Sequence, residues 1–217
     1  MSQFDSTMRQ RISYQAILLG VTALLASAAL AFAYLQTAPR IEQQNAADLT
    51  ASLKAVIPGI AYENDLLSDR VVIDSGVGSS KTTVYRARMQ GEVVAVVFQV
   101  IGKGYGGEIT AVMGLDRAGN ITSVRVVSHH ETPGLGDKIE AAKSPWINSF
   151  TGKGLDNPDE RGWRVRKDGG EFDQFSGATI TPRALVAAIK GGLDLYAAHR
   201  GEILNQSVTA AIQESAK

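Results

Sequence analysis

A long uncharged apolar stretch near the N-terminus constrains the fold of this chain more than any other feature. Residues 16–35 contain no charged side chain and are rich in Ala and Leu. About twenty apolar residues in a helix span a bilayer core of roughly 30 Å. Tyr14 and Tyr34 lie near the two ends, where interfacial aromatic residues are expected. The sequence therefore predicts a transmembrane helix over residues 12–35.

A cleaved signal peptide is the alternative interpretation, because Ala31-Phe32-Ala33 looks like a small-residue cleavage site. The apolar run is longer than the usual signal-peptide core of about 7–15 residues, which favours a retained anchor. Arg9 and Arg11 precede the span and predict a cytoplasmic segment at residues 1–11 by the positive-inside rule, against the single Arg40 beyond it. The rest of the chain then lies outside the cytoplasm.

The composition excludes several kinds of function. The 217 residues include 22 basic and 22 acidic side chains and no cysteine. The chain therefore holds no disulfide, no cysteine-ligated zinc and no ordinary iron–sulfur cluster of its own. No basic cluster is interleaved with aromatic residues, so nucleic acid is not an expected partner. Any redox chemistry has to use another bound cofactor.

The periodicity changes from helical to alternating near Lys81. Residues 36–80 predict a helical stalk, ended by Pro58-Gly59, and an irregular lead-in. Alternating apolar residues predict two hairpins, at 84–98 and 109–127. Further expected elements are helical pieces at 138–142 and 145–150, a strand at 163–167 and a helix at 183–199. The pattern predicts an α+β fold with a mostly antiparallel sheet in residues 81–200, followed by a C-terminal helix or tail at 201–217.

The segment from Asp173 to Pro182 combines a tight turn with a helix start. Thr181 is a suitable N-cap, and Pro182 fits the first helical position, where its missing N–H costs nothing. Thr179 precedes them on a Gly177-Ala178 turn. A phosphate held near Thr179 would face the helix N-terminus, where free N–H groups and the helix dipole favour anions.

Two other segments invite a ligand hypothesis that their context does not support. Residues 102–107 contain a formal G-x-G-x-x-G after a predicted strand, but a strand follows instead of the helix that a dinucleotide fold requires. His129 and His130 suggest a metal, yet adjacent side chains on a strand point to opposite faces. No helix-borne H-E-x-x-H is present either. The sequence predicts no metal site.

Three ordered motifs resemble one family of flavoproteins. Ser176-Gly177-Ala178-Thr179, with Asp173 upstream, resembles the flavin-attachment motif of the FMN-binding subunits of Rnf and Na⁺-translocating NADH:quinone reductase complexes. The Gly-Tyr-Gly-Gly segment at 104–107 and the loop at 129–136 match the same family at corresponding positions. The resemblance is strongest to the G subunits of Rnf (Rsx) complexes, with the related C subunits of the quinone reductase as the alternative.

The resemblance implies a covalently bound cofactor. FMN would be joined through its phosphate to Thr179, which makes the chain a phosphoprotein. The residues expected beside the cofactor are Tyr105, Gly106, Gly107, Glu131, Thr132 and Leu135. Glu131 and Thr132 are expected to hydrogen-bond ring or ribityl oxygens, and Leu135 to form an apolar wall. No residue of this chain is expected to be catalytic.

A separate flavin transferase is expected to attach the FMN. A Thr hydroxyl is a poor nucleophile without an adjacent base, and the sequence around Thr179 supplies no obvious one. The family's transferase uses FAD and a divalent metal. Its recognition sequence here would be Asp173 to Thr179. Within and beside that sequence, Ser176, Gly177, Ala178 and Thr181 are also expected at the cofactor site.

By resemblance, the chain is an inner-membrane electron carrier with a periplasmic C-terminal domain. It would pass electrons between partner subunits of an ion-translocating complex that links ferredoxin and NAD. Three other functions stay open on the sequence: a stand-alone FMN reductase, a non-redox membrane-tethered scaffold, and a secreted binding protein released near Tyr34.

Overall fold

The structure is a computed structural model that describes residues 2–74 and 81–205. It divides into two compact units, Met1–Asp48 and Leu49–Lys217. The first unit consists of one helical segment, and the second contains the sheet, the loops around it and the C-terminal helix.

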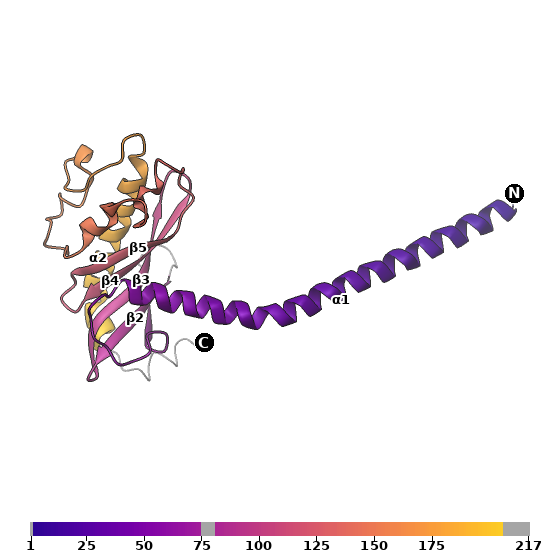
Figure 1. Ribbon diagram of the computed structural model, residues 1–217, viewed down its shortest axis with the longest axis horizontal. Helices are drawn as coiled ribbons and strands as arrows, with labels where there is room; N and C mark the ends of the chain where they lie inside the picture. The colour runs from indigo at the N-terminus through magenta and orange to yellow at the C-terminus, as the bar shows by residue number, and fades with distance from the viewer. Residues whose placement is uncertain (1, 75–80, 206–217) are drawn as a thin grey trace. The chain divides into compact units, whose positions relative to one another are not determined.

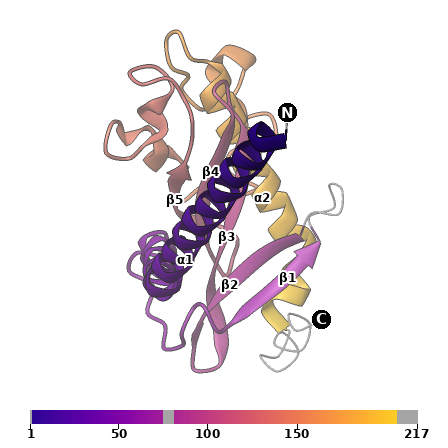
Figure 2. The ribbon, with the colours of Figure 1, turned by 90° about the vertical axis from the view of Figure 1, so that its right-hand side faces the viewer.

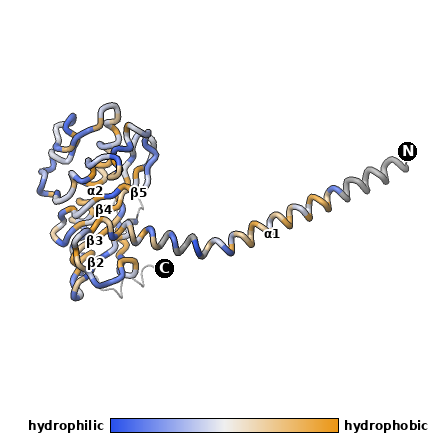
Figure 3. The backbone as a smooth tube through the Cα atoms, viewed as in Figure 1, coloured by the Kyte–Doolittle hydropathy of each residue, from blue (hydrophilic) through white to orange (hydrophobic). Residues whose placement is uncertain are grey.

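The N-terminal helix α1 runs without interruption from Ser2 to Ala55 (Figure 1). Its segment Gln15–Ala38 is 24 residues long, has a mean hydropathy of 2.3 and is not buried. Figure 3 shows this stretch as the mainly hydrophobic part of the helix. By length and composition it can cross a membrane, and within residues 2–74 and 81–205 no other helix qualifies. The predicted stalk is therefore a continuation of the same helix, which ends just before Pro58-Gly59.

The second unit is built on a five-stranded antiparallel sheet in the order β1-β2-β3-β4-β5 (Figures 1 and 2). The strands are β1 (Arg70–Asp74), β2 (Lys81–Met89), β3 (Glu92–Lys103), β4 (Glu108–Asp116) and β5 (Ile121–Ser128). Both predicted hairpins are confirmed: β2 and β3 turn at Gln90-Gly91, and β4 and β5 turn between Asp116 and Asn120. Sheet and helices together confirm the α+β class.

The sheet begins earlier in the chain than the periodicity indicates. β1 lies inside the stretch that we expected to be an irregular lead-in, and it pairs with β2 from Arg70↔Tyr85 to Asp74↔Lys81. Val71 and Ile73 are buried, so this short strand contributes to the core. With only five residues, β1 gives too short an alternation to be recognised from sequence.

Both faces of the central strand β3 are buried. Val96 and Phe98 point into one cluster, which includes Leu185 and Ile189 from the helix α2 (Ile180–Asn205). Ala95 and Val97 point into the opposite cluster. There they pack with the end of α1 and the segment after it, through Leu53, Val56, Ile57 and Leu66. Side chains that alternate along β3 therefore contribute to two hydrophobic cores, one on each face of the sheet. The helix α2 covers one of the two faces (Figure 2).

The strand expected at 163–167 is not formed. Val165 makes a single bridge to Phe172, and residues Arg166–Asp168 form a 3₁₀ turn. Trp163 and Val165 are buried because they join an aromatic cluster, and no ladder orders this segment. The cluster consists of Trp146, Phe150, Trp163, Phe172 and Phe175. Alternating burial against aromatic rings resembles a strand pattern in sequence, which explains the wrong prediction.

The predicted short helical pieces are 3₁₀ helices, at Asp137–Ile139 and Pro145–Phe150. The predicted helix at 183–199 is extended at both ends, because α2 spans Ile180–Asn205. Of the C-terminal helix or tail expected at 201–217, residues 201–205 belong to α2. The remainder, 206–217, lies outside the described residues.

Candidate functional site

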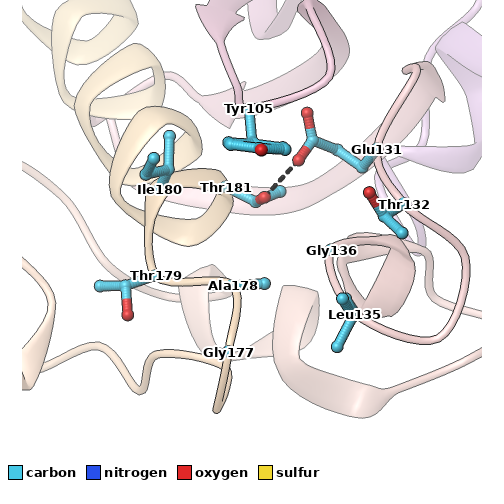
Figure 4. A pocket seen from close by; sticks show the side chains of 10 residues that line it. All are labelled: Tyr105, Glu131, Thr132, Leu135, Gly136, Gly177, Ala178, Thr179, Ile180 and Thr181. Carbon is cyan, nitrogen blue, oxygen red and sulfur yellow. Dashed lines mark hydrogen bonds between the residues drawn. The ribbon is translucent and has the colours of Figure 1, made fainter.

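Three separate chain segments enclose a cavity of about 370 Å³ (Figure 4). The turn after β3 contributes Tyr105, and the loop after β5 contributes Glu131, Thr132, Leu135 and Gly136. The start of α2 contributes the run 177–181. All three motifs singled out in the sequence therefore meet at one place, although about 75 residues separate the first from the last.

The start of α2 differs from the prediction by two residues. The first intrahelical bond runs from the Arg183 N–H to the Thr179 carbonyl, at 3.3 Å. Thr179 therefore occupies the N-cap position, and the assignment of Thr181 as N-cap is wrong. Thr181 and Pro182 lie in the first turn of α2, and both are buried. The Thr181 hydroxyl does not cap the helix. It donates a hydrogen bond to Glu131, in the loop after β5.

The N-terminus of α2 presents backbone donors beside Thr179 that have no acceptor within residues 2–74 and 81–205. The N–H groups of Ile180 and Thr181 precede the first intrahelical bond, and Pro182 has no N–H. Such free donors and the positive end of the helix dipole favour an anion. The turn before them is closed by the Ala178 N–H donating to the Phe175 carbonyl at 3.1 Å. Gly177 adopts φ 80°, which other residues rarely adopt.

A buried carboxylate lies between the three segments. Glu131 is only 5 % exposed. Its Oε1 accepts a hydrogen bond from the Gly106 N–H at 2.9 Å, and its Oε2 accepts one from the Thr181 hydroxyl (Figure 4). The glycine-rich turn, the loop after β5 and the first turn of α2 are thereby joined through one side chain.

The glycine-rich segment is a hairpin turn and not a dinucleotide fingerprint. β3 ends at Lys103 and β4 begins at Glu108, and the Gly104 N–H donates to the Gly107 carbonyl at 2.7 Å. The turn projects Tyr105 at the cavity with 74 % of its surface exposed. Gly106 and Gly107 do not line the cavity; the Gly106 N–H contributes by binding Glu131.

The rim of the cavity is apolar. Besides Tyr105, the exposed large side chains that line it are Leu135, 44 % exposed, and Ile180, 46 % exposed. Leu135 sits on a turn in which the N–H groups of Leu135 and Gly136 both donate to the Thr132 carbonyl at 3.1 Å. Ile180 is a lining residue that the sequence analysis missed. The only available signal was an apolar residue at the exposed start of a helix.

Two predicted recognition residues lie away from the cavity. Asp173 is exposed, its carboxylate pairs with Arg166 at 3.1 Å, and its carbonyl accepts from the Trp146 indole N–H at 2.8 Å. Ser176 is exposed in the turn before Gly177. Neither residue lines the cavity, whereas Gly177, Ala178, Thr179 and Thr181 do.

A polar network supports the loop from behind. His129 accepts the Glu131 N–H on Nδ1 at 3.1 Å, and its Nε2 lies 2.9 Å from Glu140 Oε1. Lys143 bridges Glu140 and Asp137 at 2.6 and 3.0 Å. Hydrogen bonds from Lys143, and then from His129, lower the pKa of Glu140. The backbone of Gly134, followed by Lys143, lowers the pKa of Asp137. His129 thus belongs to the support of the loop.

The cavity residues fit a phosphorylated, planar aromatic cofactor such as FMN. The volume of the cavity falls in the range of small-ligand sites, which are largely apolar with a few placed polar groups. Tyr105 and Leu135 offer apolar surface for a ring, while Glu131 and Thr132 offer oxygens. The N-terminus of α2 offers donors for a phosphate. The site therefore defines a cofactor-binding domain that follows a helix able to span a membrane.

Comparison with known proteins identifies the family. Residues 104–194 match the FMN-binding domain family, and residues 5–56 match the RnfG N-terminal region. The chain is 48 % identical to the G subunit of the ion-translocating oxidoreductase complex of Cereibacter sphaeroides over 189 residues, which cover 87 % of this chain and 85 % of that protein. It is 41 % identical to the corresponding protein of Vibrio vulnificus over 202 residues, covering 92 % and 96 %. The chain belongs to the RnfG family, the G subunits of ion-translocating oxidoreductase complexes.

A solved structure shares the fold. The crystal structure of the C subunit of Na⁺-translocating NADH-quinone reductase from Parabacteroides distasonis matches with a TM-score of 0.51 and 16 % sequence identity. The match covers 77 % of this chain and 96 % of that one. At this identity the similarity shows the fold alone.

Proposed function

We propose that this chain is a membrane-anchored electron carrier whose FMN is joined through its phosphate to the Thr179 hydroxyl. One observation carries the proposal: Thr179 occupies the N-cap of α2 and lines the same cavity as Tyr105, Glu131 and Leu135. A phosphate on Thr179 would lie beside the free N–H groups of Ile180 and Thr181. A ring attached to it would reach the apolar rim.

The residues around the cavity divide the work of binding. Tyr105, Leu135 and Ile180 supply apolar surface that shields a ring from water. Glu131 and Thr132 supply oxygens from the loop after β5, across the cavity from Ile180 in Figure 4. FMN itself supplies the redox chemistry, because it accepts and releases electrons. The chain's own contribution is to orient the cofactor and set its electrostatic surroundings.

Attachment requires a second enzyme, because nothing in the described residues activates Thr179. Among residues 2–74 and 81–205, no side chain makes a hydrogen bond to the Thr179 hydroxyl, and the nearby Glu131 carboxylate is engaged by Gly106 and Thr181. In the proposed reaction, a flavin transferase binds FAD with a divalent metal. The Thr179 oxygen attacks the FMN-side phosphorus, its proton leaves to solvent, and AMP is released. The exposed turn with Asp173, Ser176 and Gly177 is accessible to such an enzyme.

The helix segment Gln15–Ala38 anchors the carrier in the inner membrane in this proposal. Arg9 and Arg11 support a cytoplasmic N-terminus by the positive-inside rule, and in this proposal the FMN-binding domain lies in the periplasm. Its partners are the other subunits of an ion-translocating complex that links ferredoxin and NAD. Covalent attachment keeps FMN on a domain from which free cofactor would diffuse away.

The mass of the intact chain tests the proposal. The full chain is coexpressed with its flavin transferase, extracted from membranes and denatured, as wild type, Thr179→Ala and Thr132→Ala. We expect a gain of one FMN less one water in the wild type and in Thr132→Ala, whose hydroxyl also lines the cavity. We expect no gain in Thr179→Ala.

An unmodified wild-type chain, with the transferase shown to be active on another substrate, would overturn the covalent link. A modified Thr179→Ala chain would place the link on another residue. Native protein that binds no FMN at all would remove the electron-carrier function and favour a scaffold.

A further inference from the structure

Glu131 is a buried acid without a buried base. Its two side-chain hydrogen bonds come from the Gly106 N–H and the Thr181 hydroxyl, both neutral donors. Both bonds have the carboxylate as acceptor. No salt bridge involves Glu131 anywhere in residues 2–74 and 81–205.

The surrounding glycines keep space for this side chain. A Cβ added at Gly104 would lie 2.3 Å from Glu131 Oε1, and one at Gly136 would lie 2.9 Å from Glu131 Oε2. The Gly136 Cβ would also lie 2.8 Å from the Thr181 hydroxyl oxygen. Two of the three segments therefore use glycine where any other residue would collide with the carboxylate or with its hydrogen-bond partner.

The backbone of Glu131 is fixed as well. Its N–H donates to His129 Nδ1, and His129 Nε2 is held by Glu140. This arrangement assigns the Nε2–H tautomer of His129 from its hydrogen bonds. Hydrogen bonds therefore fix both the backbone and the carboxylate of Glu131, as in a preorganised functional group.

We propose that Glu131 is a positioning residue with two effects: it ties the three walls of the cavity together, and its uncompensated negative charge lowers the reduction potential of the flavin held there. The second effect rests on the proposed function. Glu131 is only 5 % exposed, so solvent screens its charge weakly, and a fixed anion raises the free energy of any further negative charge beside it. Added electrons bring such charge to a bound ring, so the anion opposes reduction.

The charge is tested by the midpoint potential of the attached FMN in the full, membrane-extracted chain. Glu131→Gln keeps the size of the side chain and removes its charge. We expect it to shift the one-electron equilibrium at least tenfold toward the reduced form, an increase of about 59 mV. Glu108→Gln removes an exposed carboxylate from the same hairpin and serves as the control. It should shift the equilibrium less than about threefold, because solvent and salt screen it.

A second variant separates charge from packing. Glu131→Asp keeps the charge but cannot reach both donors, so we expect its equilibrium to stay within about threefold of the wild type. If Glu131→Gln leaves the potential unchanged, the charge effect is wrong. If Glu131→Asp shifts the one-electron equilibrium tenfold toward the reduced form, the effect comes from packing. The charge effect is then refuted as well, whether or not the Gln variant folds.

The tie is tested without flavin, by hydrogen exchange on the full chain carrying Thr179→Ala. Adding Thr181→Val removes one of the two bonds. We expect the amides of 104–107 and 131–136 to exchange at least about fivefold faster, because their opening loses a bond to a charged group. Unchanged exchange would refute the tie. This readout holds even if the wild type carries no FMN, so failure of the proposed function is distinguished from failure of the tie.

Discussion

The second compact unit, Leu49–Lys217, contains two sites of buried charge that differ in their partners. Arg86 on β2 is fully buried, and its guanidinium binds Asp69 Oδ1, with the Nε contact at 2.7 Å. Asp69 Oδ2 also binds Arg88 Nε at 2.5 Å, and Arg86 donates to the Ile203 carbonyl near the end of α2 at 3.2 Å. At the other end of α2, Glu131 is almost as deeply buried, and its side-chain donors within residues 2–74 and 81–205 are both neutral.

The comparison distinguishes a buried charge that stabilises the fold from a buried charge that faces a ligand site. Asp69 pairs with Arg86 and Arg88, connects the residue before β1 with β2, and does not line the cavity at the start of α2. Burial lowers the pKa of Arg86, and Asp69 opposes this shift. Glu131 lines a cavity and leaves its charge uncompensated. A fold tolerates such a charge where its field acts on a ligand, which is why unneutralised buried groups concentrate at functional sites.

The largest effect is expected from breaking the paired charge. Asp69→Ala removes the carboxylate that pairs with the buried Arg86 guanidinium, so the free energy of unfolding should fall by about 3–5 kcal/mol. Urea unfolding of the full chain in detergent, followed by the fluorescence of buried Trp146 and Trp163, measures it.

The matched controls are two carboxylates with other surroundings. Glu92→Ala breaks an exposed pair with Arg117 and should cost less than about 1 kcal/mol. Glu131→Gln keeps acceptor and size and should cost about 0.5–1.5 kcal/mol. If Glu131→Gln destabilises as much as Asp69→Ala, Glu131 is a structural charge and the contrast between the two regions fails.

A middle effect is expected from filling the space beside Glu131. Gly104→Ala places a Cβ 2.3 Å from the carboxylate, and such overpacking costs about 1–3 kcal/mol. Less FMN should be attached to this variant, because the cavity wall is displaced. Thermal unfolding and the intact-mass yield measure the two outcomes.

Gly191→Ala is expected to change the free energy of unfolding in the opposite direction. Nothing lies within 4 Å of a Cβ at this helical position, so the variant should gain about 0.5–1 kcal/mol with full attachment. Equal behaviour of the two glycine variants would show that the turn at Gly104 adapts, and that the site is less rigid than its contacts indicate.

The smallest effect concerns the polar network behind the loop. In the folded chain the pKa of Asp137 lies below its ordinary 3.8 and that of Glu140 below 4.5, so both groups stabilise the fold above those values. This stability is lost as pH falls through the lowered pKa values, because the unfolded chain then binds more protons. Lys143→Met should move both pKa values back toward normal and make the decline of the melting temperature in acid shallower.

Lys143→Met is also expected to change stability at alkaline pH. Glu140 and then Asp137 raise the pKa of Lys143 above 10.5, so its contribution is present below 10.5 and lost at higher pH. Melting temperatures of wild type and Lys143→Met against pH measure both limbs. Parallel curves would show that this network does not contribute to stability, in contrast to the Asp69–Arg86 pair.

Local patterns in the sequence account for the elements and motifs that were predicted. Twenty uncharged residues suffice for the membrane span, and alternation over 84–98 and 109–127 suffices for two hairpins, because these signals depend only on neighbours along the chain. The motif with Thr179 and the turn with Tyr105 were recognised without knowledge of their distance in space. The predicted strand at 163–167 failed because burial against aromatic rings produces the same alternation as a ladder.

The sequence by itself determined the helix able to span a membrane, the α+β class, the hairpins and the motif residues that line the cavity, since each leaves a continuous signature over a few neighbouring residues. Only the tertiary structure decided that Thr179 caps α2 while Thr181 binds Glu131. It also decided that Ile180 lines the rim, and that Asp69 receives a guanidinium while Glu131 does not. The physical reason is that a side chain's partners are set by packing between segments distant in the chain, and no local pattern records which partner arrives.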